Sequence, residues 1–308
     1  MTSRKLRIGT RGSPLALAQT AIVKGLLEGA SQGVEFEVVP VRTRGDAVPP
    51  ERRGESDGKG VFTKDIEAML LEGSLDLAVH SMKDLSVDLD GGLTIAAAPP
   101  RGDPRDALVS AGDRRLGALP TGATIGTSSV RRKAQLLNMR RDLRLVDLHG
   151  NVETRVRKMT ELGIHGVVLA AAGLDRLSIG TKAAERFPTD QLVPAAGQGA
   201  LAVETLRKND EVIRLVSKIS DAKTMAATEC EREFARAVGA DCDVPVGAFA
   251  AYNGRSVTLT GVIASPDGTD VIRRGATSTE MAGLGARLGK EMLELGGSKL
   301  LAGGARRV

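Results

Sequence analysis

Two kinds of hydrophobic pattern follow one another along most of this chain. Short, largely apolar runs predict strands at residues 6–10, 36–41, 75–80, 93–98, 123–127, 143–148, 166–172 and 201–204. Between several of these runs, apolar residues that recur every three or four positions predict helices that begin after residues 13, 61, 129 and 151. Strands that alternate with helices predict an α/β fold.

The most informative strand is followed by a polar segment, in the stretch LDLAVHSMKDL at residues 75–85. Neither glycine nor proline accounts for the polar segment as a simple turn. Ligands in open α/β sheets collect just beyond the carboxyl ends of strands. Lys83 and Asp84, side by side there, can bind an anion and act on a positive charge. Taken alone, the same residues fit a solvated loop with a chance ion pair equally well.

The first strand ends in a similar way. Arg11 stands at the tip of this strand, Ser13 is suited to cap the next helix, and Pro14 is suited to its first position. Backbone N–H groups at such a helix start favour an anion, and arginine adds a two-pronged grip on a carboxylate. The Gly-Ser turn matches neither a Walker loop nor GxGxxG.

Cations follow three strands between residues 123 and 176. Arg131 and Arg132 lie in the first turn of a helix that follows Thr127 and Ser129. Arginines there oppose the helix dipole, which indicates that they bind something negative. The other two strand exits contain the residues His149, Asn151 and Arg155, and then Asp175 and Arg176. This clustering at one sheet edge is a stronger signal than the net charge.

The last third of the chain has a different pattern. A helix is expected at 225–238, a hairpin at 257–265 and 269–276, and a last helix at about 280–294, which together predict a small α+β domain. Cys230 falls on the apolar face of the first helix, where it is expected to be inert packing. Cys242 lies between two aspartates past that helix. From the residues alone, it is either a functional thiol or an ordinary loop residue.

Composition excludes several classes of protein. The 308 residues, 42% hydrophobic and 26% charged, are typical of a globular protein with two or three domains. Only 2% of residues are aromatic, so a stacking platform for nucleic acid is not expected, and the net charge of +5 also fits a small polyanion. The two cysteines have no zinc-site spacing. No metal is expected. Without an apolar signal region or spanning segment, a cytoplasmic location is predicted.

A polar segment rich in glycine and proline occupies residues 47–60. It predicts a mobile loop, which is either a lid over a site or a surface loop without a role. Small residues at 194–200 predict a hinge or a second crossover between domains.

Seven motifs in order resemble the porphobilinogen deaminase (hydroxymethylbilane synthase) family: RIGTRGSPLALAQ, VHSMKDL, GTSSVRR, GNVETR, AAGLDRL, PAAGQGA and CDVPVG. The resemblance implies two doubly wound α/β domains like those of periplasmic binding proteins, plus a small α+β C-terminal domain. It places domain 1 at 1–99 and 200–218, domain 2 at 100–199 and domain 3 at 219–308. The active cleft is expected between the first two, and the chain is expected to be a monomer.

The resemblance also implies a reaction. Four porphobilinogen molecules, each losing ammonia, are joined head to tail onto a dipyrromethane cofactor, and water releases hydroxymethylbilane for haem and other tetrapyrroles. The cofactor attachment falls on Cys242 through a thioether. The aspartate of the S-M-K-D motif, Asp84, is the catalytic residue, since a carboxylate stabilises the cation left by ammonia and helps to move protons.

Further site residues are implied by the same motifs. The expected cofactor-binding residues are Lys83, Ser81, Thr127, Ser129, Arg131, Arg132, Asn151, Arg155 and Gly199. The expected substrate-binding residues are Arg11, Ser13, Gln19, Lys59, Phe62, His149 and Arg176. The cations among them suit the two carboxylates that each pyrrole brings.

The chain departs from the family pattern at two positions. His149 stands where the family usually has arginine, and histidine is mostly neutral at pH 7 and lacks the two-pronged contact. Glu55 replaces a lysine of some relatives, which makes the loop less cationic.

The main alternative is a non-enzymatic small-anion-binding protein on the same fold. It explains neither Asp84 among the cations nor the isolated Cys242. DNA binding is disfavoured because no helix carries a continuous basic face.

Overall fold

The described residues form three β-sheets. The structure is a computed structural model that describes residues 4–47, 63–240 and 244–304. The chain divides into two compact units, Met1–Gly102 with Ala200–Met225, and Asp103–Gly199 with Ala226–Val308. The first unit holds one sheet, and the second holds the other two.

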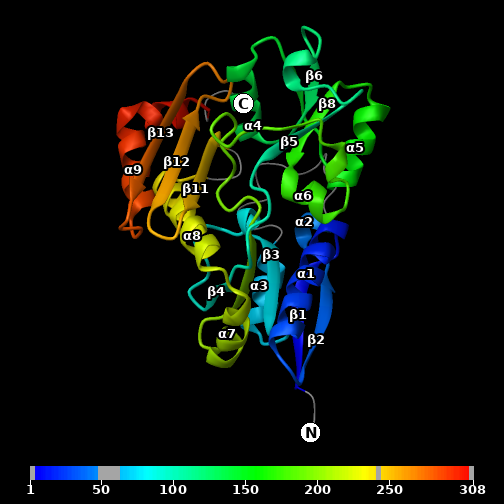
Figure 1. The fold of residues 1–308 in the computed structure, drawn as a ribbon, viewed down its shortest axis with the longest axis vertical. Coiled ribbons are helices and arrows are strands. Elements are labelled where there is room, and N and C mark those ends of the chain that lie inside the picture. The colour runs from blue at the N-terminus through cyan, green and yellow to red at the C-terminus, as the bar shows by residue number, and fades with distance from the viewer. Residues whose placement is uncertain (1–3, 48–62, 241–243, 305–308) are drawn as a thin grey trace. The chain divides into compact units, whose positions relative to one another are not determined.

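The sheet of the first unit has the strand order β2-β1-β3-β10-β4 (Figure 1). Its first three strands are parallel, and β10 runs antiparallel to both neighbours. The strands are β1 (Arg4–Arg11), β2 (Val34–Val41), β3 (Leu77–Ser81), β4 (Leu93–Ala97) and β10 (Leu201–Leu206). The helices of this unit are α1 (Pro14–Ala30), α2 (Arg44–Ala47), α3 (Lys64–Leu71) and α7 (Asp210–Val216), with 3₁₀ turns at Met82–Asp84 and Ser217–Ile219.

Helices cover both faces of this sheet because its strands are apolar on both sides. Leu77 and Val79 pack with Val23 and Leu27 of α1 on one face. Ala78 packs with Ile66 and Leu70 of α3 on the other. Residues Leu77–Val79 of β3 are therefore buried on both faces, and polar side chains follow at the carboxyl end of this strand.

The second sheet, of the other unit, repeats this arrangement with the order β7-β6-β8-β5-β9. Again three strands are parallel, and β5 is antiparallel to its neighbours. The strands are β5 (Asp106–Ser110), β6 (Thr124–Gly126), β7 (Arg144–Val146), β8 (Gly166–Ala170) and β9 (Glu185–Arg186). The helices are α4 (Val130–Met139), α5 (Val152–Glu161) and α6 (Ala171–Arg176), with 3₁₀ turns at Leu116–Ala118 and Gly180–Lys182.

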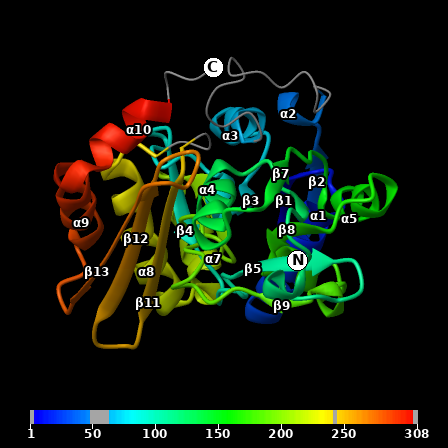
Figure 2. The ribbon, with the colours of Figure 1, turned by 90° about the horizontal axis from the view of Figure 1, so that it is seen from above.

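The third sheet is an antiparallel meander, β11-β12-β13, with helices packed on it (Figures 1 and 2). Gly285 lets α9 approach α8 closely, because a Cβ at this position would lie 2.0 Å from the carbonyl oxygen of Cys230. The elements are α8 (Ala222–Ala237), β11 (Val246–Tyr252), β12 (Val257–Ala264), β13 (Val271–Ser278), α9 (Leu284–Met292), a π-helical segment (Leu293–Gly297) and α10 (Ser298–Gly304).

The predicted fold class is confirmed, with two α/β sheets and a small C-terminal sheet packed with helices. Most predicted strands form within a few residues of the expected bounds. The run at 166–172 was predicted to be strand throughout, which is wrong at its end, because α6 begins at Ala171 directly after β8. Strands β5, β9 and β11 were not predicted. The division into three domains stays a prediction.

Among the described residues, no helix is both long and apolar enough to cross a membrane.

Candidate functional site

A polar pocket lies at the carboxyl ends of β1 and β3, which are parallel neighbours. It belongs entirely to the first unit. Of the predicted site residues, Arg11, Ser13, Gln19, Ser81 and Asp84 line it, together with Leu15, Ala16, Thr63, Val79 and His80. The structure thus brings together residues that are up to 73 positions apart in the sequence (84 − 11).

The start of α1 forms one wall of the pocket. Ser13 caps this helix as predicted, since its Oγ accepts a hydrogen bond from the backbone N–H of Ala16 at 3.3 Å. Pro14 occupies the first helical position, where its missing N–H costs nothing. Backbone N–H groups and the positive end of the helix dipole therefore accompany Arg11 at this wall.

A pair of side chains ties α1 to the end of β3. Gln19 Nε2 lies 2.9 Å from Ser81 Oγ, and the same hydroxyl lies 3.1 Å from Gln19 Oε1. Gln19 is buried, so this double contact satisfies its amide inside the unit. The contact fixes the position of β3 just before Asp84.

Asp84 is held by a short 3₁₀ turn, Met82–Asp84, rather than by an extended loop. Met82 anchors the turn because its side chain is buried, and its N–H donates to the carbonyl of Ala200 at 3.0 Å. Lys83 is half-buried and Asp84 is exposed at the pocket. An anchored turn thus presents a carboxylate to solvent beside Arg11.

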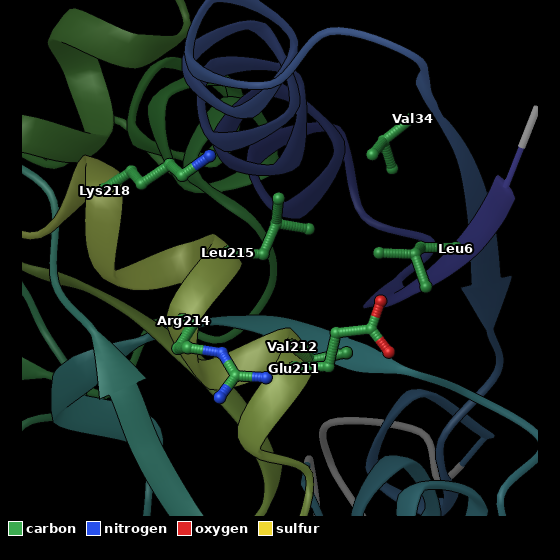
Figure 3. A pocket seen from close by; sticks show the side chains of 7 residues that line it. All are labelled: Leu6, Val34, Glu211, Val212, Arg214, Leu215 and Lys218. Atoms are coloured by element: carbon green, nitrogen blue, oxygen red, sulfur yellow. The ribbon is translucent and has the colours of Figure 1, made fainter.

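A second hollow in the same unit is a poorer candidate. Leu6 and Val34 line one side of it, and residues of α7 and the turn that follows, among them Leu215 and Lys218, line the other (Figure 3). It lies at the amino ends of β1 and β2, whereas ligands of open α/β sheets bind at the carboxyl ends.

In the second unit, the two arginines at the start of α4 are paired with a buried carboxylate. Asp106 accepts from Arg131 Nη1 at 2.7 Å and from Arg132 Nε at 2.8 Å. Arg131 also donates to the carbonyl of Val193, and Arg132 to that of Val168. The chain itself thus supplies a negative partner for these arginines, which the sequence did not predict, and their role in cofactor binding stays a prediction.

The charges of this group do not cancel. Two guanidinium groups and one carboxylate leave a net charge of +1 in a buried place, and Gln198 also donates to Asp106 at 3.1 Å. Burial lowers the pKa of Arg132, while Asp106 opposes that shift. The first turn of α4 is therefore strongly positive.

The predicted hydroxyl and amide residues of this unit cap helices. Ser129 Oγ accepts from the N–H of Arg132 at 3.4 Å, and Asn151 Oδ1 accepts from the N–H of Thr154 at 2.8 Å. Thr127 is buried, and its Oγ1 accepts from the N–H of Ser129 at 3.3 Å. These side chains shape the two helix starts, with Arg155 in the first turn of α5.

His149 lies next to the start of α4. Its Nδ1 is 3.4 Å from Ser128 Oγ, a hydroxyl that also accepts from the N–H of Leu148.

Arg176 is a half-buried cation with spare donors. It ends α6, and its Nη2 donates to the carbonyl of Gly199 at 2.6 Å. Gly199 has φ of +88°, a conformation that favours glycine and that presents this carbonyl to the guanidinium. Burial lowers the pKa of Arg176 to about 10. Among the described residues, no carboxylate is hydrogen-bonded to it, so a bound anion would offset the cost of its burial.

Three predicted site residues lie outside the described residues: Cys242, Lys59 and Phe62. The same holds for most of the predicted mobile loop. Cys230 is buried in the apolar cluster of the third sheet, as expected, and burial raises the pKa of its thiol to about 12. Among the described residues, no cluster of side chains is suited to hold a metal ion.

Comparison with known proteins decides the family. Residues 6–214 match the family model of the porphobilinogen deaminase dipyromethane cofactor binding domain, and residues 225–294 match that of the porphobilinogen deaminase C-terminal domain. The chain belongs to the porphobilinogen deaminase family.

Individual relatives agree over nearly full length. A porphobilinogen deaminase of Syntrophotalea carbinolica is 44% identical over 98% of this chain and 96% of its own length. One of Roseiflexus sp. is 45% identical over 97% of this chain and 99% of its own length. Among solved structures, a putative methionine-binding lipoprotein of Bacillus subtilis is 14% identical over 72% of this chain and 92% of its own, with a TM-score of 0.45.

As a porphobilinogen deaminase family member, the chain is a transferase of tetrapyrrole biosynthesis with a dipyrromethane cofactor. The described residues fit such a group, since a dipyrrole with acidic side arms needs cations that can bind carboxylates. Arg176, with donors to spare, and the net positive charge at the start of α4 meet that need.

Proposed function

We propose that Asp84 is the catalytic carboxylate, and Cys242 the cofactor anchor, in the assembly of hydroxymethylbilane from four molecules of porphobilinogen. The observation that carries the first assignment is the position of Asp84 on an anchored turn in a pocket that also contains Arg11. A carboxylate and a guanidinium in one pocket suit a substrate that carries both an amine and acids.

The carboxylate of Asp84 acts on the positive charge that forms as ammonia leaves the aminomethyl arm. A fixed negative group stabilises such a charge, most strongly where water is scarce. The same carboxylate can take and return protons as the carbon–carbon bond forms. When bound through the Cys242 sulfur, the cofactor supplies the primer on which the units are joined.

Cations of both units hold the acid side arms in this proposal. Arg11 and Lys83 serve in the first unit, and Arg131, Arg132, Arg155 and Arg176 in the second. Ser13, Gln19, Ser81, Thr127, Ser129 and Asn151 supply neutral hydrogen bonds or fix the walls, and Gly199 orients Arg176. Lys59, Phe62 and His149 complete the proposed substrate contacts.

The remaining assignments follow the family resemblance. We propose a cytoplasmic monomer without a nucleic-acid partner, with domain 1 at 1–99 and 200–218, domain 2 at 100–199 and domain 3 at 219–308. Family membership favours the enzyme over the non-enzymatic anion-binding alternative.

Intact mass and porphobilinogen consumption test these roles together. The wild-type chain is expected to carry the mass of one dipyrromethane, and Cys242→Ser to show the bare polypeptide mass. Cys230→Ser is the matched control and should keep the adduct, because Cys230 is buried packing. Asp84→Asn should keep the adduct but consume porphobilinogen about 100-fold more slowly or worse.

The control for Asp84 is Asp88→Asn, four residues further on, exposed and outside the pocket. A bare wild-type mass, an adduct on Cys242→Ser, or an unimpaired Asp84→Asn variant would each contradict the assignment concerned.

A further inference from the structure

A buried histidine–glutamate pair stands directly behind the Asp84 pocket. His80 lines the pocket, and its Nε2 is 3.1 Å from Oε2 of Glu204, in the adjacent strand β10. The side chains are 3% and 0% exposed, so neither group reaches bulk water through the sheet. The described residues donate no hydrogen bond to either oxygen of Glu204. A buried carboxylate needs a compensating partner, and the imidazole of His80 is the nearest one that the described residues supply.

A second glutamate backs the same wall. Thr63 lines the pocket beside His80, and its hydroxyl donates to the carboxylate of Glu67, one turn along α3. Helix α3 packs against both β3 and β10. Burial, together with the negative charge of Glu204, raises the pKa of Glu67, while Thr63 and His80 oppose that shift. Glu67 is half-buried, which gives the group a way to exchange protons with solvent.

We propose that His80, Glu204 and Glu67 form a proton-accepting group behind the Asp84 pocket, which takes up the proton released at each condensation. The geometry supports this because His80 and Thr63 both line the pocket, and His80 lies 3.1 Å from Glu204 on the strand that pairs with β3. The proposal rests on the role of the Asp84 pocket given above.

The chemistry releases a proton that such a group can accept after Asp84. When a porphobilinogen unit is added, the C–N bond of its protonated aminomethyl arm breaks, and ammonia leaves with the electron pair. A C–C bond then forms between the methylene carbon and the free α-carbon of the preceding pyrrole, whose C–H bond breaks and leaves its electrons in the ring. One proton is thus released per unit, with no oxidation or reduction. The two carboxylates and the imidazole of the cluster offer sites that can accept it.

Few charged residues of the surrounding elements lie near this cluster among the described residues. Glu67 is influenced by Lys64 on its own helix, whereas Asp65 is paired with Arg44. Arg11 and Asp84 face His80 from the pocket, and Arg7 of β1 is paired with Asp76. Strand β4, the other neighbour of β10, has no charged residue. The described charges closest to the cluster are therefore Lys64 on the helix of Glu67 and the Arg11 and Asp84 side chains of the pocket.

The pH dependence of turnover tests the proposal. Porphobilinogen consumption by adduct-loaded enzyme would be measured from about pH 6 to pH 9.5 for wild type, Glu67→Gln and Glu204→Gln, with rates divided by the amount of adduct found by mass. Glu72→Gln is the matched control, because Glu72 is an exposed glutamate just past the end of α3. Thermal unfolding shows which variants are folded.

In the proposed role, the cluster can accept a proton only while one of its members is deprotonated, so turnover should slow at low pH. The substitution Glu67→Gln removes one accepting carboxylate and should therefore move the acid limb of the pH profile. We expect a shift of at least about half a pH unit and a plateau lowered about threefold or more, with Glu72→Gln unchanged. A merely structural role lowers the rate equally at every pH. An unshifted profile in Glu67→Gln, or in a folded Glu204→Gln, overturns the proposal. The Asp84 assignment is tested independently of this proposal, because it fails only if the Asp84→Asn variant consumes porphobilinogen at the wild-type rate.

Discussion

At the scale of single residues, the positive charge that the site offers to a ligand depends on the acceptor to which each arginine is hydrogen-bonded. Arg176 has a carbonyl as its partner, which leaves its charge available to a ligand. Arg131 and Arg132 have a carboxylate, which reduces the charge they offer from +2 to +1. Arginines that look alike in the motifs therefore differ in the charge that they leave for a ligand. We expect this difference to decide how strongly each binds an acid side arm.

His149 gives a prediction at this scale. Its ring lies 3.4 Å from the Ser128 hydroxyl, in a position where a guanidinium would be charged at every physiological pH. We expect His149→Arg to consume porphobilinogen faster near pH 7, by about fivefold if one charge-assisted contact adds about 1 kcal/mol. A steady-state assay checks this, with neutral His149→Gln as the control. Equal or slower turnover of the arginine variant would refute it.

At the scale of elements, α4 shows how one helix start can serve both stability and binding. Arginines in a first turn oppose the helix dipole, so the helix alone does not explain them. Asp106 of β5 compensates, and its contacts also tie the helix to the strand and to Gln198. The helix start is positive because the sheet supplies only one carboxylate for two guanidinium groups.

Removal of that carboxylate should be costly. In Asp106→Asn, two buried guanidinium groups lose their counter-charge, and breaking a buried pair costs about 3–5 kcal/mol. We expect the free energy of unfolding in urea to fall by about that amount. The control is Asp142→Asn, which removes an ion pair to Arg140 near the surface and should cost about 1 kcal/mol or less. A similar loss in both variants would contradict the account.

At the scale of the whole molecule, stability should depend on pH through a few carboxylates. Hydrogen bonds from Arg105 and Arg186 lower the pKa of Asp103 to about 2, although desolvation by burial is the largest single influence and opposes them. A carboxylate with a depressed pKa stabilises the fold above the unfolded value of 3.8, and this contribution is lost as pH falls towards 2. Burial raises the pKa of the Cys230 thiol to about 12. This thiol stabilises the fold below its unfolded value of 9.0, and the contribution is lost as pH rises towards 12.

Asp103→Asn tests the acid side. Its unfolding temperature should lie below that of wild type at pH 7 and pH 5, and the difference should shrink as pH approaches 2, where Asp103 of the wild type is also neutral. Differential scanning calorimetry at several pH values measures this. Asp190→Asn, an exposed carboxylate, is the control and should show a smaller, flatter difference. A difference for Asp103→Asn that is constant with pH would rule out the explanation.

Much of the fold was predictable because helix caps and hydrophobic patterns in short stretches of the sequence specify the same elements that the structure contains. Ser13 and Pro14 fix the start of α1, and the alternating apolar residues of β3 fix which side chains enter the core. The strands that were missed lack such signals. Strand β5 follows a segment rich in proline and charge, and β11 is a run of small residues, so only pairing with β8 and β12 reveals them.

The sequence by itself determined the family, the fold class and the candidate chemistry, because caps, strand exits and ordered motifs are local and survive in the linear chain. It also placed Arg11, Ser13 and Asp84 at strand exits, where parallel pairing gathers them. Only the tertiary structure decided which charges are neutralised. Asp106 meets Arg131 from 25 positions away and Glu204 meets His80 from 124, and no spacing rule predicts contacts set by sheet pairing and burial.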